Sequence, residues 1–534
     1  MAAHKGVVAA GHPLTAEAGA EVLREGGNAV DAAVCAVLTS FVTESPLTGF
    51  GAGGFMLIHQ SAQGGAGGAT EEPPSDGVLV DFFVAAGGAD GVERTAELIP
   101  IPVYFDETPQ TFNCGAASCG VPGNPAGLEQ VARRFGSMPL SELAAPGIRL
   151  GRDGVRMTKG QAYFHEILHP ILTSTPECAA LYAPGGRRLR EGDTFLYPEM
   201  SQALERFAAE GSEPFYRGDI ARKVCDWVRG RGGTLGTDDM EAYEPVEREP
   251  VRTGFRGADV LTNPPPSSGG ILIAYSLGLL ERLGDRSGAE QIVAATEAAN
   301  AHREEDFHEG LHTPGYLEGF MDPERLNEVA GRIRAGDWVG GVGGAGGPGE
   351  QLGSTTHISV LGADGMCASV TCSNGTGSGL LVPGTGVHVN NMLGEEDLNP
   401  HGFHRIPPGR RVSSMMAPTV ALRDGEVELG LGSAGSNRIR SAILQTVVRV
   451  LEEGMDADEA VRAGRLHFEA GTVQAEPGVE EEGLARLELR GVPVVRWKRQ
   501  NLYFGGVQAV AHDPATAVLS GGGDPRRGGA VVLA

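Results

Sequence analysis

The sequence predicts an α+β fold, with helices concentrated in the first part of the chain and strands in the second. Amphipathic segments that end at glycines recur through residues 1–354, whereas runs that alternate apolar and polar residues dominate residues 355–534. A chain of 534 residues exceeds one ordinary hydrophobic core, so we expect two lobes or one large layered unit. The hydrophobic fraction of 41% is typical of a folded globular protein.

The first part of the chain opens with two predicted helices. One begins at the N-cap candidate Thr15 and breaks at Gly26-Gly27, and a mostly apolar helix follows from about Asn28. From Glu199 to Leu283 short helices alternate with short strands. Between these regions we expect strands within 48–60 and 77–87, and glycine-terminated helices within 124–136 and 141–154.

The second part of the chain is richer in predicted strands. From Thr356 to Ser373, two alternating runs flank the turn Gly-Ala-Asp-Gly, which predicts a β-hairpin. Residues 427–454 are typical of a strand, a glycine-rich turn and a helix, and residues 501–533 of closing strands. The glycine-rich tether Gly340–Gly347 separates the two parts.

Charge and cysteine content exclude several classes of protein. A net charge of -25 leaves no basic stripe for nucleic acid and disfavours an anionic membrane surface. No segment reaches the roughly 20 apolar residues that span a bilayer. The start of the sequence lacks the apolar region of a signal peptide, so we expect a cytoplasmic protein. The seven scattered cysteines are expected to be reduced, mostly buried thiols.

Thr355 closely follows the glycine run and opens a strand-like segment. A glycine run by itself is more typical of a plain linker. If the peptide bond between Ser354 and Thr355 is cut, however, the new α-amino group has a pKa of about 8 and can take the proton of its own residue's hydroxyl. The sequence therefore raises the hypothesis that the tether is a processing site and Thr355 an N-terminal nucleophile.

Nine short motifs follow one another along the chain. They are GGNAVDAAVCAVL (Gly26–Leu38), PAGLEQVARRFGSMPLSEL (Pro125–Leu143), FYRGDIA (Phe215–Ala221), PPPSSGGI (Pro264–Ile271), TTHISV (Thr355–Val360), VNNM (Val389–Met392), VSSMMAPTV (Val412–Val420), GSAGSNRI (Gly432–Ile439) and GGGDPRRGGA (Gly521–Ala530). Each is weak alone, but in this order they resemble the γ-glutamyltranspeptidase (γ-glutamyltransferase, glutathione hydrolase) family of N-terminal-nucleophile hydrolases. The resemblance implies a four-layer αββα sandwich and a precursor cut before Thr355 into two associated chains. It also implies cleavage or transfer of a γ-glutamyl-type acyl group, with no metal or organic cofactor.

The resemblance also implies roles for individual residues. Thr355 matches the threonine that cleaves the precursor and then attacks the substrate amide, and Ser373 matches a second hydroxyl near the new amine. Gly435 and Ser436 fall on the Gly-Gly whose backbone N–H groups form the oxyanion hole. Out of this context, Gly435 and Ser436 are equally typical of a plain strand-to-helix turn.

Substrate binding is implied for a second set of residues. Ser413 and Ser414 match the serine pair that holds the glutamyl α-carboxylate, and Asn374 lies near an asparagine that contacts the substrate. In isolation, all three are more typical of loop or turn residues.

The chain departs from the family pattern where the substrate is recognised. The family has an arginine for the substrate α-carboxylate at the position of Phe83, and a neutral ring cannot form that bidentate ion pair. Met392 replaces an amide that helps to bind the substrate α-amine, although Glu395, Glu396 or Asp397 can still supply a carboxylate. Acylases for other amides, such as glutaryl-type acylases or small amidohydrolases, therefore stay open as the alternative.

Two further alternatives remain at this point. His308-Glu309-Gly310-Leu311-His312 is a formal H-E-x-x-H zinc motif, but Gly310 and Pro314 interrupt the helix that the motif requires, so a solvated helix end is favoured. A non-enzymatic protein that binds a small amide is the third possibility. Activity that is insensitive to chelators would exclude the zinc enzyme. Turnover of a chromogenic anilide would exclude the non-enzymatic binding protein.

Overall fold

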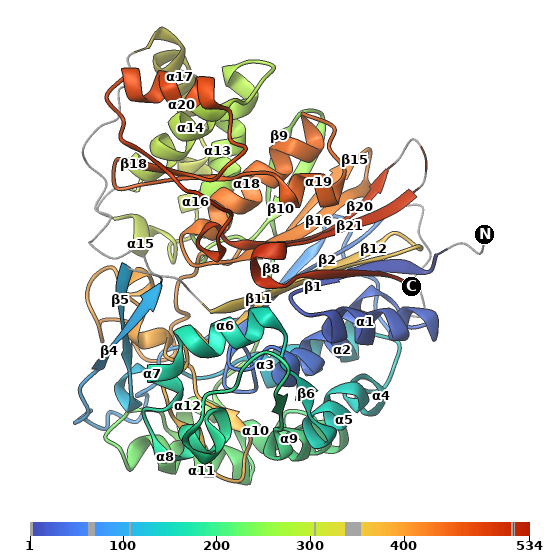
Figure 1. The fold of residues 1–534 in the computed structure, drawn as a ribbon, viewed down its shortest axis with the longest axis vertical. Coiled ribbons are helices and arrows are strands. Elements are labelled where there is room, and N and C mark those ends of the chain that lie inside the picture. Colours follow the sequence, from blue (N-terminus) through green and yellow to red (C-terminus); the bar gives the residue numbers. More distant parts are fainter. Residues whose placement is uncertain are drawn as a thin grey trace.

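The computed structural model describes residues 4–61, 70–105, 108–303, 306–336, 354–513, 516 and 518–534. The predicted tether at 340–347 lies outside the described residues. Helices and mainly antiparallel sheets together make an α+β fold (Figure 1).

The first sheet carries the strand that begins at Thr355. Among the described residues it has seven strands, and every neighbouring pair is antiparallel. In spatial order they are β22 (Ala530–Leu533), β1 (Gly6–Ala10), β11 (Thr355–Gly362), β12 (Met366–Ser373), β2 (Gly53–Gln60), β3 (Val78–Phe82) and β8 (Val246–Arg248). The predicted hairpin is confirmed as β11 and β12, joined by a tight turn.

The second sheet has six antiparallel strands among the described residues. In spatial order they are β21 (Val518–Gly523), β20 (Gly506–Asp513), β16 (Glu426–Ala434), β15 (Thr419–Arg423), β10 (Ala258–Thr262) and β9 (Val251–Phe255). Both sheets combine strands from before and after Thr355, so neither part of the chain has a large sheet of its own.

The two sheets face each other across a buried interior. On β11, alternate residues point inward, since strand side chains alternate between faces: Ser359 Oγ donates to the carbonyl oxygen of Gln508 on β20 at 3.1 Å. The ring of His357 lies against Gly432 of β16, where an added Cβ would come within 2.3 Å of it. His357 Nδ1 also contacts Thr371 Oγ1 at 2.7 Å. A hydrogen bond between the sheets, and the absence of a Cβ at Gly432, thus allow the two sheets to lie close together.

Helices cover the outer faces of both sheets. The first sheet packs against α1 (Pro13–Arg24) and the wholly buried α2 (Ala29–Thr43), and the second against α13 (Gly269–Leu283) and α18 (Arg438–Leu451) (Figure 1). Ile358 and Val360, the outward residues of β11, share their apolar core with α2.

One predicted helix start is wrong. The N-cap of α1 is His12, whose Nδ1 accepts the N–H of Leu14 at 3.1 Å, and Pro13 occupies the first turn. Thr15 lies inside the helix, and its hydroxyl donates to Glu44 at 3.0 Å instead of capping. The second helix begins next to Asn28, as predicted, and Asn28 caps it in a capping box with Asp31.

The remaining helices flank these layers, most of α3–α12 on the side of the first sheet (Figure 1). They are α3 (Asn124–Phe135), α4 (Leu140–Leu143), α5 (Ala145–Asp153), α6 (Lys159–Ile167), α7 (His169–Leu172), α8 (Pro176–Tyr182), α9 (Pro198–Glu210), α10 (Glu213–Tyr216), α11 (Asp219–Arg229), α12 (Thr237–Glu241), α14 (Ala289–Ala301), α15 (Phe307–Gly310), α16 (Tyr316–Phe320), α17 (Pro323–Ala335), α19 (Ala457–Arg462) and α20 (Glu481–Leu489). Within the described ranges, none of these helices has both the length and the apolar character needed to cross a membrane.

Smaller sheets complete the fold. They pair β4 (Ile99–Phe105) with β5 (Thr108–Cys114), β6 (Val155–Arg156) with β7 (Thr194–Phe195), β13 (Leu381–Val382) with β14 (Val387–His388), and β17 (Leu466–Glu469) with β18 (Thr472–Ala475) and β19 (Val494–Arg496). All seven cysteines are buried and unpaired, as the sequence predicts.

Candidate active site

Thr355 is the first residue of β11, and its side chain meets that of Ser373 on β12. The two residues lie opposite each other in the strand register, and Thr355 Oγ1 donates to Ser373 Oγ at 3.2 Å. Ser373 Oγ donates to the carbonyl oxygen of Ser354 at 2.8 Å and accepts the N–H of Gly375 at 3.1 Å. Ser373 therefore contacts both the predicted nucleophile and the carbonyl group of the predicted cleavage site.

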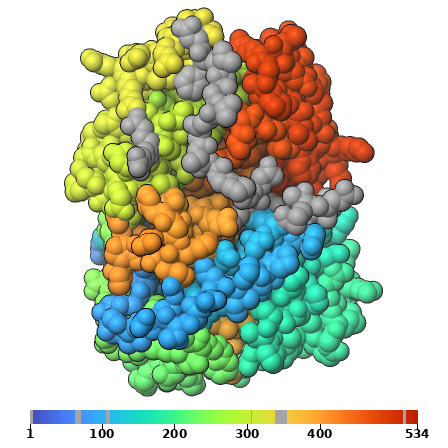
Figure 2. All heavy atoms as spheres, turned by 90° about the vertical axis from the view of Figure 1, so that its left-hand side faces the viewer, coloured from blue at the N-terminus to red at the C-terminus, as the bar shows by residue number. Residues whose placement is uncertain are grey.

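A pocket with about 410 Å³ of empty space opens at Thr355. Its walls combine apolar side chains, hydroxyl groups and two carboxylates: Phe83, Thr355, Ser373, Gly375, Met392, Glu395, Asp397, Leu398, Ser414, Met415, Met416, Ser436 and Ile439. In Figure 2 the segment around residue 400, in orange, lies at the surface between the blue segment around residue 100 and the yellow helices that precede residue 337. That segment begins where Asp397 and Leu398 line the pocket.

The turn between β16 and α18 forms one wall of this pocket. Gly435 has a φ of 128° and Ser436 a φ of 51°, both in the left-handed region that favours glycine. Ser436 Oγ donates to Asp397 Oδ2, a contact that holds this turn against the segment after β14. The structure places Ser436 on the pocket wall and Gly435 next to it, directly before the first turn of α18, whose N–H groups favour negative charge.

The two predicted binding serines face different spaces. Ser414 lines the Thr355 pocket, its Oγ accepts the N–H of Met416 at 3.0 Å, and its carbonyl oxygen accepts from Ser267 Oγ at 2.7 Å. Ser413 lines a neighbouring pocket together with His308 and His312. The structure thus brings Ser414, but not Ser413, to the nucleophile.

Asn374 also lies away from the pocket wall. Its side-chain Nδ2 donates to the carbonyl oxygen of His388 at 3.2 Å, and its backbone N–H donates to Leu47. In this structure Asn374 braces the loop that follows Ser373.

Two acids, Glu395 and Asp397, face the same pocket. Glu395 is buried, and its Oε1 accepts from Asn391 Nδ2 at 3.0 Å. Burial, followed by the charge of Asp397, raises the pKa of the Glu395 carboxyl to about 8. Burial also raises the pKa of Asp397, while the Ser436 hydroxyl and then the Arg438 charge act in the opposite direction.

Phe83, which the family resemblance matches to an arginine position, is a buried apolar residue in this structure. Its side chain is only 1% exposed and stacks on Phe55, with ring centroids 5.3 Å apart. The arginines behind it are bound to Asp81: Arg248 Nη2 lies 2.8 Å from that carboxylate and Arg411 Nε lies 3.5 Å from it. Neither arginine lines the pocket at Thr355.

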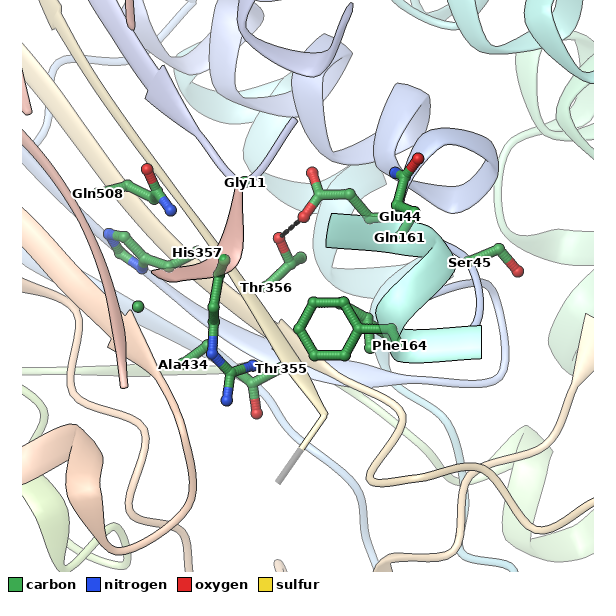
Figure 3. A pocket seen from close by; sticks show the side chains of 13 residues that line it. Gly11, Glu44, Ser45, Gln161, Phe164, Thr355, Thr356, His357, Ala434 and Gln508 are labelled. Carbon is green, nitrogen blue, oxygen red and sulfur yellow. Dashed lines mark hydrogen bonds between the residues drawn. The ribbon is translucent and has the colours of Figure 1, made fainter. Parts of the chain in front are cut away.

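A second cavity lies on the other side of Thr355, and sequence reasoning missed it. Figure 3 shows Glu44, from the end of α2, directed toward Thr356, whose Oγ1 donates to Glu44 Oε2. Thr355 and Arg527 line the same cavity. Burial raises the pKa of Glu44 to about 7, although hydrogen bonds from Thr356 and Thr15 partly offset this shift. The available signal was a single acid that directly follows a long apolar helix.

Replacing Glu44 by glutamine is expected to change how stability depends on pH. With a folded-state pKa of about 7 and an ordinary value of 4.5, the folded chain keeps a proton that the unfolded chain has released. The resulting stabilisation is complete below about pH 4.5 and is lost as the pH rises through about 7, which amounts to about 3 kcal/mol. Urea unfolding at about pH 5 and pH 8 should show that Glu44→Gln lacks this loss. The exposed control Glu25→Gln should behave like the wild type, and an unchanged pH dependence in Glu44→Gln would contradict the argument.

The H-E-x-x-H motif does not adopt the continuous helix on which such a zinc site depends. Its helix α15 is a single turn, Phe307–Gly310, so His312 lies beyond the helix end, and Glu309 pairs with Arg410 at 2.8 Å. Burial lowers the pKa of His308 and of His312 to about 4. In the described ranges, no three His, Cys, Asp or Glu side chains are grouped so that they could hold a metal ion. The structure therefore gives the zinc interpretation no support.

The chain is similar to known proteins over almost its whole length. A family model described as Gamma-glutamyltranspeptidase matches residues 15–534. The chain is 30% identical to the glutathione hydrolase proenzyme of Bacillus subtilis (strain 168) over 560 residues, covering 99% of this chain and 91% of that protein. It is 31% identical to the acylase ACY 1 proenzyme of Pseudomonas sp. (strain V22) over 527 residues, covering 96% of this chain and 90% of the acylase.

A solved structure extends the likeness to the fold. The cephalosporin acylase of Bacillus halodurans superimposes with a TM-score of 0.81 at 24% identity, covering 99% of this chain and 96% of that one. With the family model matching almost the whole length, the chain belongs to the gamma-glutamyltranspeptidase family.

Proposed function

We propose that this protein is an autoprocessed, γ-glutamyltransferase-like amidohydrolase that uses Thr355 as its nucleophile. The observation that carries the proposal is the hydrogen bond from Thr355 Oγ1 to Ser373 Oγ, two residues that line one pocket. Ser373 Oγ also donates to the carbonyl oxygen of Ser354. The relatives named proenzymes support processing of this chain. We place the cut between Ser354 and Thr355, after which residues 1–354 and 355–534 stay together. Strands from both parts in each sheet support that association.

In the proposed reaction, the free α-amine of Thr355 takes the proton of its own hydroxyl as Oγ1 attacks the amide carbonyl carbon. Backbone N–H groups at Gly435 and Ser436 stabilise the negative oxygen of the tetrahedral intermediate. The intermediate collapses with proton transfer to the leaving amine, which leaves an ester on Thr355. Water, or an acceptor amine, then attacks the ester and releases the acyl group, and the hydroxyl regains its proton.

We also propose that the fold is the four-layer αββα sandwich of N-terminal-nucleophile hydrolases. Two antiparallel sheets with a shared interior, and helices against both outer faces, support this arrangement. The nucleophile then lies at the start of a central strand, β11, where Thr355 pairs with Ser373 of β12, and β1 pairs with the strand further along, from Ile358 to Gly362.

An acylase for a non-glutamyl amide is the second candidate. Phe83 favours it, because the buried ring leaves the pocket without the cation that would pair with a glutamyl α-carboxylate. Both candidates use the same nucleophile and differ only in the acyl group.

The intact masses of purified wild type and Thr355→Ala test the proposal. Wild type should give two fragments that meet between Ser354 and Thr355, and Thr355→Ala should give one uncut chain. An uncut wild type that still hydrolyses amides would overturn the proposal.

Replacing Ser373 by alanine is expected to lower kcat/KM about tenfold. The change removes one hydrogen bond to the attacking hydroxyl, equivalent to about 1.4 kcal/mol. Ser369→Ala is the matched control, since Ser369 is a buried serine of the same strand whose Oγ donates to Leu431 and lies outside the pocket. The control should lose some stability but retain the wild-type kcat/KM, and equal activities of the two variants would count against a role for Ser373.

A further inference from the structure

The charges in the Thr355 pocket indicate which acyl group it accepts. Among the described residues that line this pocket, two are acidic, Glu395 and Asp397, and none is lysine, arginine or histidine. A substrate carboxylate in this pocket would therefore meet two acids and, among these described residues, no lysine, arginine or histidine side chain, which is unfavourable in a buried site.

The two acids differ in their surroundings. Burial raises the pKa of Asp397, but a hydrogen bond from Ser436 and the charges of Arg438 and Arg303 partly offset this rise. Glu395 receives a hydrogen bond from Asn391, but the charges that act on it are those of the acids Asp397 and Glu396. No cation among the described residues therefore acts on the buried Glu395 carboxyl in this structure. A cationic group of a substrate in the pocket would favour the ionised form of Glu395.

The rest of the pocket is apolar. Phe83, Met392, Met415 and Met416 line it, and their side chains bind methylene groups and exclude water. Phe83 stacks on Phe55, so this position presents an apolar ring to the pocket and not a cation.

We propose that the enzyme acts on amides whose acyl group joins a short apolar stem to a basic nitrogen and lacks a free carboxylate. Glu395 pairs with the ammonium group, and the stem lies against Phe83 and the methionines. This inference rests on the proposed function, since it assigns the acyl group that Thr355 receives.

Four 4-nitroanilides that share one stem test the inference. The acyl groups are 4-aminobutyryl (ammonium only), γ-glutamyl (ammonium and carboxylate), glutaryl (carboxylate only) and butyryl (neither). We expect 4-aminobutyryl to give the highest kcat/KM, at least tenfold above butyryl and at least 100-fold above glutaryl. A higher value for γ-glutamyl or glutaryl, equal values for all four, or no turnover of 4-aminobutyryl would overturn the inference.

Substitutions at Glu395 and Phe83 test whether these residues determine the acyl preference. Glu395→Gln should reduce the ratio of 4-aminobutyryl to butyryl kcat/KM at least tenfold, whereas Glu396→Gln, an exposed neighbour, should keep the wild-type ratio. Phe83→Arg should raise the ratio of γ-glutamyl to 4-aminobutyryl kcat/KM at least tenfold, and Phe83→Leu should not. An unchanged ratio in Glu395→Gln overturns the inference even if Phe83→Arg fails to fold.

The intact mass of the same samples separates the two proposals. A cleaved wild type that prefers a carboxylate-bearing acyl group refutes only the substrate class. An uncut wild type refutes the proposed function itself.

Discussion

Replacing Thr355 by alanine is expected to leave an uncut chain with kcat/KM lowered by about 10⁴-fold to 10⁶-fold, the range seen when a catalytic nucleophile is removed. The variant lacks the hydroxyl that cuts the precursor and that would carry the acyl group. Its methyl group replaces a side chain that is only 5% exposed, so the fold should tolerate the change. Initial rates with a chromogenic anilide, on protein whose folding is checked by circular dichroism, measure the loss.

Thr355→Ser is the informative companion. It keeps the hydroxyl and the amine, so it should still be cut and should retain activity well above that of Thr355→Ala. If alanine and serine variants were equally active, another residue would be the nucleophile.

Replacing Gly435 by alanine is expected to lower kcat by about 10²-fold to 10³-fold, the cost of losing one oxyanion-hole donor. At a φ of 128° a side chain is strained, and an added Cβ would lie 2.9 Å from Gly505 Cα. The backbone must shift to relieve this contact, which moves the N–H groups at the start of α18 away from the reacting oxygen.

Gly454→Ala is the matched control for this variant. Gly454 also has a positive φ, 68°, but an added Cβ there meets nothing within 4 Å. It follows α18 at an exposed position and should affect stability more than kcat. Comparable losses of kcat in both variants would contradict an oxyanion role for the Gly435 turn.

Local sequence patterns predicted the hairpin that carries part of the site, whereas the role of Ser373 was implied by the family resemblance. The alternating runs around Gly-Ala-Asp-Gly fix the register of β11 and β12, and this register alone places Ser373 opposite Thr355. The turn at Gly435 and Ser436 was equally visible, because a glycine-rich break between a strand pattern and a helix pattern predicts a strand–turn–helix unit.

Contacts between distant segments could not be predicted in this way. Glu44 reaches Thr356 only because α2 packs on β11, and no local period encodes that crossing. Ser413 and Ser414 are neighbours in sequence, yet consecutive residues of an extended segment point to opposite sides, so only Ser414 lines the pocket. The contact of Asp397 with Ser436 likewise depends on how a loop lies against the turn before α18.

The helix start at Thr15 illustrates a competing interaction. A threonine before an apolar period is a good N-cap by propensity, but His12 caps this helix and Pro13 begins it. The Thr15 hydroxyl instead contacts Glu44 and, at 2.7 Å, Thr43. Tertiary hydrogen bonding at the end of α2 thus outweighs the local preference.

Trapping the acyl group tests the central claim most directly. Wild type mixed with an excess of a turned-over anilide and quenched in acid during the steady state should be digested and mapped by mass spectrometry. One acyl group should be found as an ester on the side chain of Thr355, in a peptide whose first residue is Thr355. An acyl group on another residue, or turnover by a chain in which Ser354 and Thr355 are still joined, would contradict the account.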